Sequence, residues 1–467
     1  MKIAFHGATQ TVTGSKHLIT LANGKQILLD CGMFQGLGPD TMPMNNHFGF
    51  DPAQVDYMVL SHAHVDHSGL IPKLIKEGFK GKIFTTAATR DLAEILLKDS
   101  AHIQANDVKF INKRRFLEGK QPIEPMYSIE HVQEAMHRFV EVPYEKPYAI
   151  DEDITLQLFE NGHILGAATI FLSIKENDKT TKIVFSGDVG RYGDYILKSP
   201  ATFPQADYII IESTYGDRLH DRVDTNSEFL RDLIIHTCID KKGKLIIPAF
   251  SVGRTQELLY TLNEMELDMK LPGVKYYVDS PLSTSATEVV KKHPECFNRQ
   301  VQRILKYDND PFDFRGLHYI EDKRASQALN GSQEPCVIIS ASGMAEAGRV
   351  KHHIANNIQD PRTTILMVGY CEKASLGARL KQHPEEVRIF GQTYQVKAEI
   401  EEINSMSAHA DYNDLCQYLS CQDPGEVKKV FVVHGEEASQ EAFKARLHKK
   451  GFLDVVIPRP HEEIGLG

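Results

Sequence analysis

The pattern of short apolar runs along the chain changes at about residue 213. No other feature of the sequence limits the possible folds as strongly. Before that point the runs are strand-like and are bounded by turn residues such as Gly, Asn or Asp, and helical patterns at about 89–115 and 128–138 interrupt them. The early runs are KQILLD (25–30), DYMVLSH (56–62), ITLQLFENGH (154–163), TIFLSI (169–174), KIVFSGD (182–188) and DYIIIES (207–213).

Beyond residue 213, strand-like runs alternate with helical patterns, which predicts a parallel sheet covered by helices. These runs are KLIIPAF (244–250), VKYYVDS (274–280), PCVIISASG (335–343) and TTILMVGY (363–370). Short strands return after about 395, and a last helical pattern covers about 436–450. The order predicts an α/β protein in which residues 213–394 form a domain inserted between residues 1–212 and 395–467.

The composition is that of a globular protein, because 42% of the 467 residues are hydrophobic and 25% are charged. This length is sufficient for two domains with separate cores. The net charge of −10 excludes a generally basic nucleic-acid-binding surface. A polyanion would therefore have to be held by local positive charge or by metal.

Cysteine usage and hydropathy indicate a cytoplasmic protein that does not enter a membrane. The seven cysteines are scattered, odd in number and free of any CxxC spacing, as in proteins with reduced thiols. The N-terminal sequence MKIAFHGATQTVTG has no apolar core of signal-peptide length, and no eighteen-residue apolar run occurs. GATQTVTGSK (7–16) does not match the spacing of a phosphate-binding loop, and we expect a hairpin turn there.

The stretch SHAHVDHSG, residues 61–69, places His62, His64, Asp66 and His67 directly after an apolar run. Imidazole and carboxylate groups are the ligands of zinc and related metals, and neighbouring side chains in a strand-exit loop can converge on one ion. A surface cluster of histidines is the alternative, but the turn at Ser68–Gly69 into a helix favours a metal site.

Further candidate ligands occur where other apolar runs end in a glycine and a single polar residue. These are His163 in ENGHILGAA, Asp188 in FSGDVGR and His434 in VVHGE. Each alone is more often a hydrogen-bonded loop residue than a ligand. Their recurrence at the ends of strands, where a rigid sheet positions active-site loops, predicts that they meet the 61–69 loop.

The sequence resembles the metallo-β-lactamase superfamily in LLDCG, SHAHVDHSG, ENGHILGAA and FSGDVGR. IESTYGD, SMSAHAD and VVHGE resemble the three added motifs of its β-CASP branch, which includes the mRNA 3′-end-processing endonuclease and its bacterial and archaeal relatives. The resemblance extends from Asp30 to His434. It implies an αββα sandwich with an inserted β-CASP domain, a parallel sheet covered by helices.

The resemblance also implies two Zn²⁺ ions, with no ligand position substituted. The implied ligands are His62, His64 and His163 for one ion, Asp66, His67 and His434 for the second, and Asp188 as the bridge. Asp30 would orient one of these ligands without binding a metal ion itself. A bridging hydroxide would attack phosphorus, with Asp66 as proton acceptor.

The general acid implied by the resemblance is His409, with Glu212 as the carboxylate that raises its pKa. The alternative for Glu212 is a strand-end carboxylate that caps the following loop.

In the inserted region, PAFSVGRTQE (248–257) and SASGMAEAGR (340–349) run from a strand into a helix, and helix N-termini favour phosphate. We expect RNA contacts there, with N-capping and packing as the alternative. The residues concerned are Ser251, Arg254, Ser342, Gly343 and Arg349.

The sequence thus predicts a zinc-dependent ribonuclease that cuts single-stranded RNA internally and leaves a 3′-hydroxyl and a 5′-phosphate. A 5′-exonuclease activity remains open, and so does a homodimer. The alternatives are a small-molecule hydrolase of the β-lactamase or glyoxalase II type, a DNA-directed relative and a non-catalytic scaffold. DNA-directed members usually carry an aliphatic residue in place of His434.

One basic segment lies in the first predicted helix. KFINKRRFLEGK (109–120) is expected to be a solvated helix face, with RNA contact as the other option.

Overall fold

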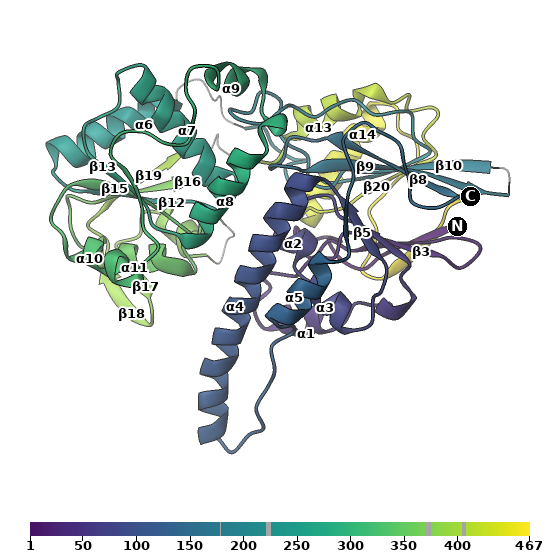
Figure 1. Cartoon of the computed structure of the whole chain (residues 1–467), viewed down its shortest axis with the longest axis horizontal. Helices are drawn as coiled ribbons and strands as arrows, with labels where there is room; N and C mark the ends of the chain where they lie inside the picture. Colours follow the sequence, from purple (N-terminus) through teal and green to yellow (C-terminus); the bar gives the residue numbers. More distant parts are fainter. Residues whose placement is uncertain (178, 221–225, 370, 372–374, 404–407) are drawn as a thin grey trace. The chain divides into compact units, whose positions relative to one another are not determined.

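The computed structural model describes residues 1–177, 179–220, 226–369, 371, 375–403 and 408–467, and these form two compact units (Figure 1). The first unit combines Met1–Leu219 with His409–Gly467, and the second is His220–Ala408. The chain therefore builds most of the first unit, passes through the second and then returns to complete the first.

The divisions lie beyond the expected ones after residues 212 and 394, for local reasons. Residues 213–219 stay with the first unit because Ser213 Oγ donates to the Val433 carbonyl at 2.7 Å. At the other division, strand β19 (Glu399–Ile403) pairs in parallel with β16 (Thr364–Val368), so the chain remains in the second unit past residue 394.

The first unit contains two sheets. One has the strand order β22-β1-β2-β3-β4-β5-β6 and the other β21-β20-β11-β10-β9-β8-β7. The first consists of β22 (Glu462–Gly465), β1 (Lys2–Phe5), β2 (His17–Thr20), β3 (Gln26–Leu29), β4 (Tyr57–Val59), β5 (Lys82–Thr85) and β6 (Phe139–Glu141). The second consists of β21 (Val455–Val456), β20 (Lys429–Val432), β11 (Tyr208–Ile211), β10 (Lys179–Phe185), β9 (Ala168–Glu176), β8 (Ile154–Glu160) and β7 (Tyr148–Ala149).

A continuous apolar core joins the two sheets, with Ile27 and Phe84 of one packed in the same cluster as Leu172 and Phe185 of the other. On the outer face of the second sheet, α13 (Tyr412–Tyr418) and α14 (Glu437–Lys449) contribute to another cluster. The helices beside the first sheet are α1 (Thr41–Asn46), α2 (Val65–Ser68), α3 (Ile71–Lys76), α4 (Ala87–Leu117) and α5 (Ile129–Met136). The expected αββα sandwich is confirmed.

Helix α4 is 31 residues long and projects away from the sandwich (Figure 1). The Thr86 hydroxyl caps its start by accepting from the Thr89 amide at 3.1 Å. The Thr86 and Thr89 hydroxyls both donate to the Gly166 carbonyl, which ties the base of the helix to the loop that follows β8. Among the described helices, α4 included, none is both long enough and apolar enough to cross a membrane.

The second unit is built on a sheet with the order β14-β13-β15-β12-β16-β19, in which all neighbouring strands are parallel. Its other strands are β14 (Leu317–Tyr319), β13 (Lys275–Val278), β15 (Cys336–Ser340) and β12 (Lys244–Pro248), and β17 (Glu386–Ile389) and β18 (Gln392–Gln395) form a separate hairpin. Its helices are α6 (Asn226–Ile234), α7 (Arg254–Leu267), α8 (Pro281–Lys292), α9 (Arg299–Ile304), α10 (Lys323–Gly331), α11 (Gly348–Asn357) and α12 (Leu376–Leu380). The expected parallel sheet is confirmed.

Short segments of other helix types complete the described secondary structure. They are η1 (Gly38–Asp40), η2 (Pro52–Gln54), η3 (Ile235–Asp240), η4 (Pro294–Cys296) and η5 (Leu419–Cys421). Residues 7–16 link the antiparallel pair β1 and β2, with the His6 amide donating to the Lys16 carbonyl at 2.8 Å, so the expected hairpin turn is confirmed.

His17 is a polar side chain in the core of the sandwich. Its ring is fully buried and meets Phe5 and Phe185 edge-on, with centroids 5.3 Å away in each case. Neither ring nitrogen has a hydrogen-bond partner among the described residues, and burial lowers the pKa of His17 well below its usual range. The neutral imidazole therefore loses two bonds to water on folding without replacing them.

We expect the exchange His17→Leu to raise the free energy of unfolding by about 1–2 kcal/mol, because an unpaired buried polar group costs about 1–3 kcal/mol. Urea unfolding followed by circular dichroism measures the change. The exposed His137 supplies a matched control, since His137→Leu should alter the unfolding midpoint little. A lower midpoint for His17→Leu would contradict the argument.

Candidate metal centre

The candidate ligands of the first unit all follow strand ends. His62 and His64 follow β4, and the one-turn helix α2 then presents Asp66 and His67. His163, Asp188 and His434 come after β8, β10 and β20 of the second sheet. The sandwich thus brings loops from both sheets to one edge, as the sequence predicted.

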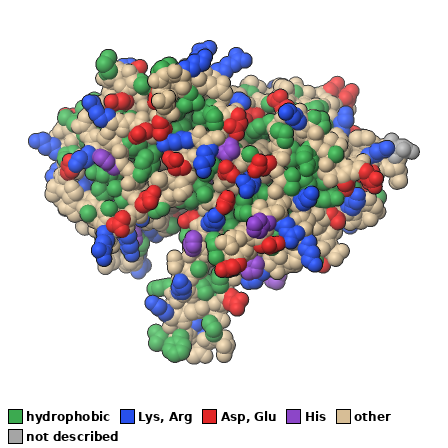
Figure 2. All heavy atoms as spheres, viewed as in Figure 1, with side chains coloured by type: hydrophobic (Ala, Val, Ile, Leu, Met, Phe, Trp, Pro, Cys, Tyr) green, Lys and Arg blue, Asp and Glu red, His purple; other side chains and the backbone are tan. Residues whose placement is uncertain are grey.

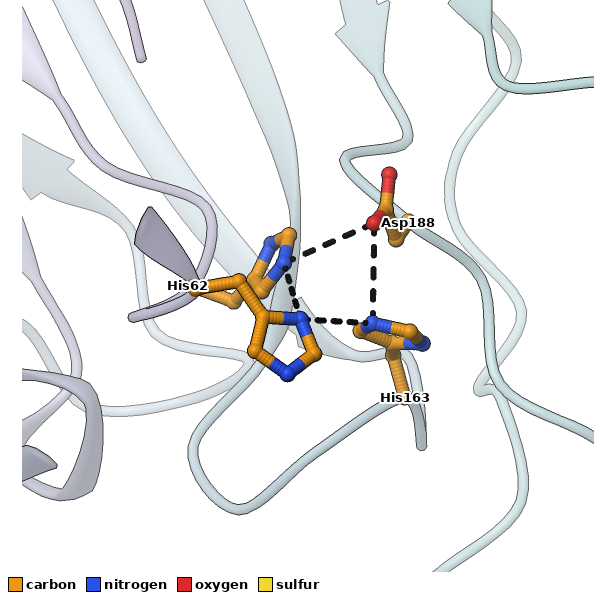
Figure 3. A group of neighbouring side chains, drawn as sticks. His62, His163 and Asp188 are labelled. Atoms are coloured by element: carbon orange, nitrogen blue, oxygen red, sulfur yellow. Dashed lines mark hydrogen bonds and ion pairs between the residues drawn. The ribbon is translucent and has the colours of Figure 1, made fainter. Parts of the chain in front are cut away.

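The first group consists of His62, His64, His163 and Asp188, whose donor atoms all lie within 4.8 Å of one another. His64 Nδ1 is 3.2 Å from His62 Nε2 and 3.1 Å from His163 Nε2. Asp188 Oδ2 is 3.6 Å from His62 Nε2 and 3.5 Å from His163 Nε2, and Figure 3 shows these three side chains pointing toward a common centre.

The second group consists of Asp66, His67, Asp188 and His434. His67 Nε2 lies 3.3 Å from His434 Nε2 and 3.2 Å from Asp188 Oδ1. His434 Nε2 is 3.4 Å from Asp66 Oδ2. Asp188 belongs to both groups and presents a different oxygen to each, which is the geometry of a carboxylate that could bridge two ions.

The protonation states of the first group suit a cation. Burial lowers the pKa of His62 and of His163 well below the usual range, and it lowers the pKa of His64 to about 4. The imidazoles are therefore neutral, and two neutral rings that turn lone pairs toward each other repel unless a proton or a cation lies between them. Spacings near 3.3 Å are those of nitrogens bound tetrahedrally to zinc at about 2.0–2.1 Å.

The second group carries the negative charge. Burial opposes ionisation of Asp188, but His434 and His67 outweigh it and hold the pKa of Asp188 well below its usual range. His67 and His434 likewise lower the pKa of Asp66 to about 2 against the effect of burial. The buried Asp188 and the partly exposed Asp66 both stay ionised at neutral pH, which matches the needs of divalent cations.

Asp30 lies behind His67, as expected. It is fully buried, and its Oδ2 is 2.6 Å from His67 Nδ1, which directs Nε2 of that ring toward the second group. The Ser61 amide and hydroxyl both donate to Asp30 at 2.8 Å. Asp30 therefore fixes the orientation of one candidate ligand and anchors the 61–69 loop.

Sequence reasoning missed several residues that orient the candidate ligands. Ser61 Oγ lies 3.0 Å from His62 Nδ1, and Thr214 Oγ1 lies 3.1 Å from His434 Nδ1. Asn161 donates from Nδ2 to the carbonyls of Ser186 and Asp188, at 2.9 and 2.8 Å. Their only signal in the sequence is their position inside the motifs SHAHVDHSG, IESTYGD and ENGHILGAA.

His409 and Glu212 form a pair beside the two groups. His409 Nδ1 lies 3.2 and 3.3 Å from the two oxygens of Glu212, and 4.0 Å from Asp188 Oδ2. Burial alone would lower the pKa of His409, but Glu212 outweighs it, and the pKa is raised to about 9. Residues 405–407 of SMSAHAD lie outside the described residues.

Glu212 also has the loop-capping role that the sequence left open. It is fully buried and accepts from the amides of Val189, at 2.6 Å, and Thr214, at 3.2 Å. One carboxylate therefore fixes two loops and faces an imidazole that carries a proton. This arrangement can deliver a proton to a leaving group near the candidate metal centre.

The residues expected to contact RNA in the second unit follow neighbouring parallel strands, with Arg254 and Arg349 in the first turns of α7 and α11. Ser251 and Arg254 follow β12, and Ser342, Gly343 and Arg349 follow β15. Both guanidinium groups already have carboxylate partners. Buried Arg254 pairs with Glu257, and Arg349 pairs with Asp279 at 2.6 Å. Their contact with RNA stays a prediction.

Three family models match the chain. The Metallo-beta-lactamase superfamily matches residues 14–236, the Beta-Casp domain matches residues 255–380, and the Zn-dependent metallo-hydrolase RNA specificity domain matches residues 393–458. Together they cover both segments of the first unit and most of the second.

Curated relatives are similar over almost the whole chain. Ribonuclease TTHA0252 of Thermus thermophilus is 35% identical, over 97% of this chain and 97% of its own. The RNase J-like protein of Methanocaldococcus jannaschii is 30% identical, over 98% of this chain and 97% of its own. Transcription termination factor FttA of Methanosarcina mazei is 28% identical, over 96% of this chain and 69% of its own.

Proposed function

Because this chain belongs to the β-CASP branch of the metallo-β-lactamase superfamily, we propose that it is a ribonuclease that hydrolyses internal phosphodiester bonds of single-stranded RNA with two zinc ions. The observation that carries the proposal is the sharing of Asp188 between two groups of imidazoles and carboxylates, most of them buried. The names of two relatives, a ribonuclease and an RNase J-like protein, support RNA as the substrate.

The donor set supports zinc, because it consists of imidazole nitrogens and carboxylate oxygens at tetrahedral spacing. Magnesium would favour oxygen ligands alone. Two divalent ions at such a site lower the pKa of bound water and neutralise the charge that develops on a phosphate in the transition state.

The side chains of the chain then have separate tasks. The resemblance assigns Asp66 as the acceptor of the proton of the attacking water, and the protonated His409 would donate a proton to the 3′-oxygen as it leaves. Glu212 holds His409 in its protonated state, and Asp30 orients His67. The products are a 3′-hydroxyl and a 5′-phosphate.

Three alternatives differ from this proposal in what they would cleave: a 5′-exonuclease, a DNA-directed nuclease and a small-molecule hydrolase. A circular single-stranded RNA has no ends, so its cleavage requires endonuclease activity, whereas a linear RNA that is shortened only from its 5′ end indicates an exonuclease. His434 supports RNA over DNA, because DNA-directed members of the branch usually carry an aliphatic residue there. A small-molecule hydrolase would turn over a thioester or a β-lactam and leave RNA intact.

The test combines metal analysis with cleavage of a circular single-stranded RNA. Wild-type protein should carry about two zinc ions per chain and lose its activity on chelation. His64→Ala should lose metal and activity together, because His64 contacts both other histidines of the first group. His137→Ala, an exposed histidine of the same unit, should retain both. RNA that stays intact with metal-loaded wild type would refute the proposal.

A further inference from the structure

The far end of helix α4 exposes large apolar side chains to solvent. We call residues 109–120 the α4 tip. Within it, Phe110, Phe116 and Leu117 are 76, 83 and 85% exposed. Figure 2 shows apolar side chains together with basic ones at this projecting end of the molecule. Apolar side chains that are exposed together on a soluble protein mark interaction sites.

The α4 tip is also strongly basic in an otherwise acidic chain. It holds five Lys and Arg residues and one Glu, whereas the whole chain has a net charge of −10. Arg114 and Lys120 share Glu118, at 2.9 and 2.8 Å. Lys109 and Lys113 have no ion-pair partner among the described residues, so their charge is available to an anionic ligand.

Cations and an aromatic ring lie on the same face of the helix. Lys109, Lys113 and Phe116 are spaced four and three residues apart, which aligns them along one side of α4. Together with Asn112 and Leu117 they line a shallow hollow of about 690 Å³. Asn112 both donates to and accepts from the backbone of Ile123, at 2.9 Å in each case, and this fixes the returning chain beside the hollow.

We infer that the α4 tip is a binding site for single-stranded RNA, separate from the candidate metal centre. Basic side chains that follow a phosphate backbone, next to aromatic rings on which bases stack, are the usual elements of single-strand binding. A second copy of this chain fits less well, because two tips with the same positive charge repel. A membrane surface fits less well, because helices that lie on a membrane carry their apolar and basic side chains on opposite faces.

The length of α4 determines which RNAs can use this site. The helix starts beside Gly166, in the loop that carries His163, and its 31 residues span about 46 Å. Only an RNA long enough to cover this distance can contact the tip and the candidate metal centre together. This consequence for RNA length rests on the proposed function, whereas binding of RNA at the α4 tip is measured without cleavage.

The first experiment measures binding of a labelled single-stranded RNA of about thirty nucleotides by fluorescence anisotropy, without added metal and over a range of salt concentrations. The slope of log affinity against log salt is negative, and each lost phosphate contact lowers its magnitude by about 0.7 for single strands. The double variant Lys109→Ala with Lys113→Ala should therefore lower it by about 1.4. The control Lys449→Ala with Lys450→Ala removes the same charge from another exposed helix end and should leave the slope unchanged.

The second experiment uses Phe116→Ala, which should weaken binding of the long RNA by about 5- to 150-fold, the range for one base–aromatic stacking contact. The KM for the long RNA should rise in parallel, while cleavage of an RNA of about five nucleotides stays at the wild-type rate. Unchanged affinity and salt slope in both tip variants would overturn the inference. So would light scattering that shows a wild-type dimer which Phe116→Ala dissociates. Failure of the proposed function is a separate result, in which wild type cleaves neither RNA.

Discussion

The exchange Asp188→Asn should reduce RNA cleavage by at least about a thousandfold and lower the metal content from about two ions per chain to one or fewer. The carboxamide keeps the shape of the side chain but removes its negative charge and one acceptor oxygen. Asp188 presents Oδ1 to His67 and Oδ2 to His62 and His163, so one substitution weakens both groups. Metal analysis and single-turnover cleavage measure the two effects.

The control for this experiment is Asp454→Asn. Asp454 is half-exposed and pairs only with Lys429 among the described residues, at 3.2 Å, so its exchange should change neither metal content nor rate. Circular dichroism of both variants checks the fold. Asp188→Asn protein that binds two ions with wild-type affinity would show that the two groups do not share this carboxylate.

The exchange His409→Ala should leave the metal content at its wild-type level and reduce the cleavage rate by about 10²- to 10⁴-fold, the usual contribution of a general acid. The reason is the position of His409, which pairs with Glu212 and only borders the two groups at 4.0 Å from Asp188. Cleavage rates at saturating RNA, measured beside zinc content, separate this effect from loss of metal.

A modified RNA identifies the role of His409 in that loss. A sulfur atom in place of the leaving 3′-oxygen needs no proton, so the deficit of His409→Ala on this substrate should shrink to less than about tenfold. Glu212→Gln should show the same pattern more weakly, because it leaves the imidazole in place but removes the charge that raises its pKa. An equal deficit on both substrates would assign His409 to positioning of RNA instead.

The residues that lie at the candidate metal centre could be predicted from the sequence, because chemistry restricts them to a few types. His163, Asp188 and His434 each follow an apolar run, and the strands that carry them end at one edge of the sandwich. Ser61 and Thr214 could not be predicted in the same way. A hydroxyl near a histidine is common, and its role depends on a ring orientation that only the fold determines.

The second unit shows where sequence reasoning reaches its limit. A helix N-terminus with an arginine predicts an anion site, yet Arg349 lies next to Asp279 and the carbonyls of Ile320 and Glu321. These partners are 28 to 70 residues away in the sequence and come from other strand ends. The second unit extends past residue 394 for a related reason, because the pairing of β19 with β16 is a contact between distant segments.

The discontinuous first unit has a consequence for the newly made protein. His409 and His434 belong to a segment that is translated after the whole of the second unit. A nascent chain that has not yet reached residue 434 lacks one member of the Asp66, His67 and Asp188 group and therefore cannot assemble it. Fragments from incomplete synthesis that end before residue 434 therefore lack a complete candidate metal centre.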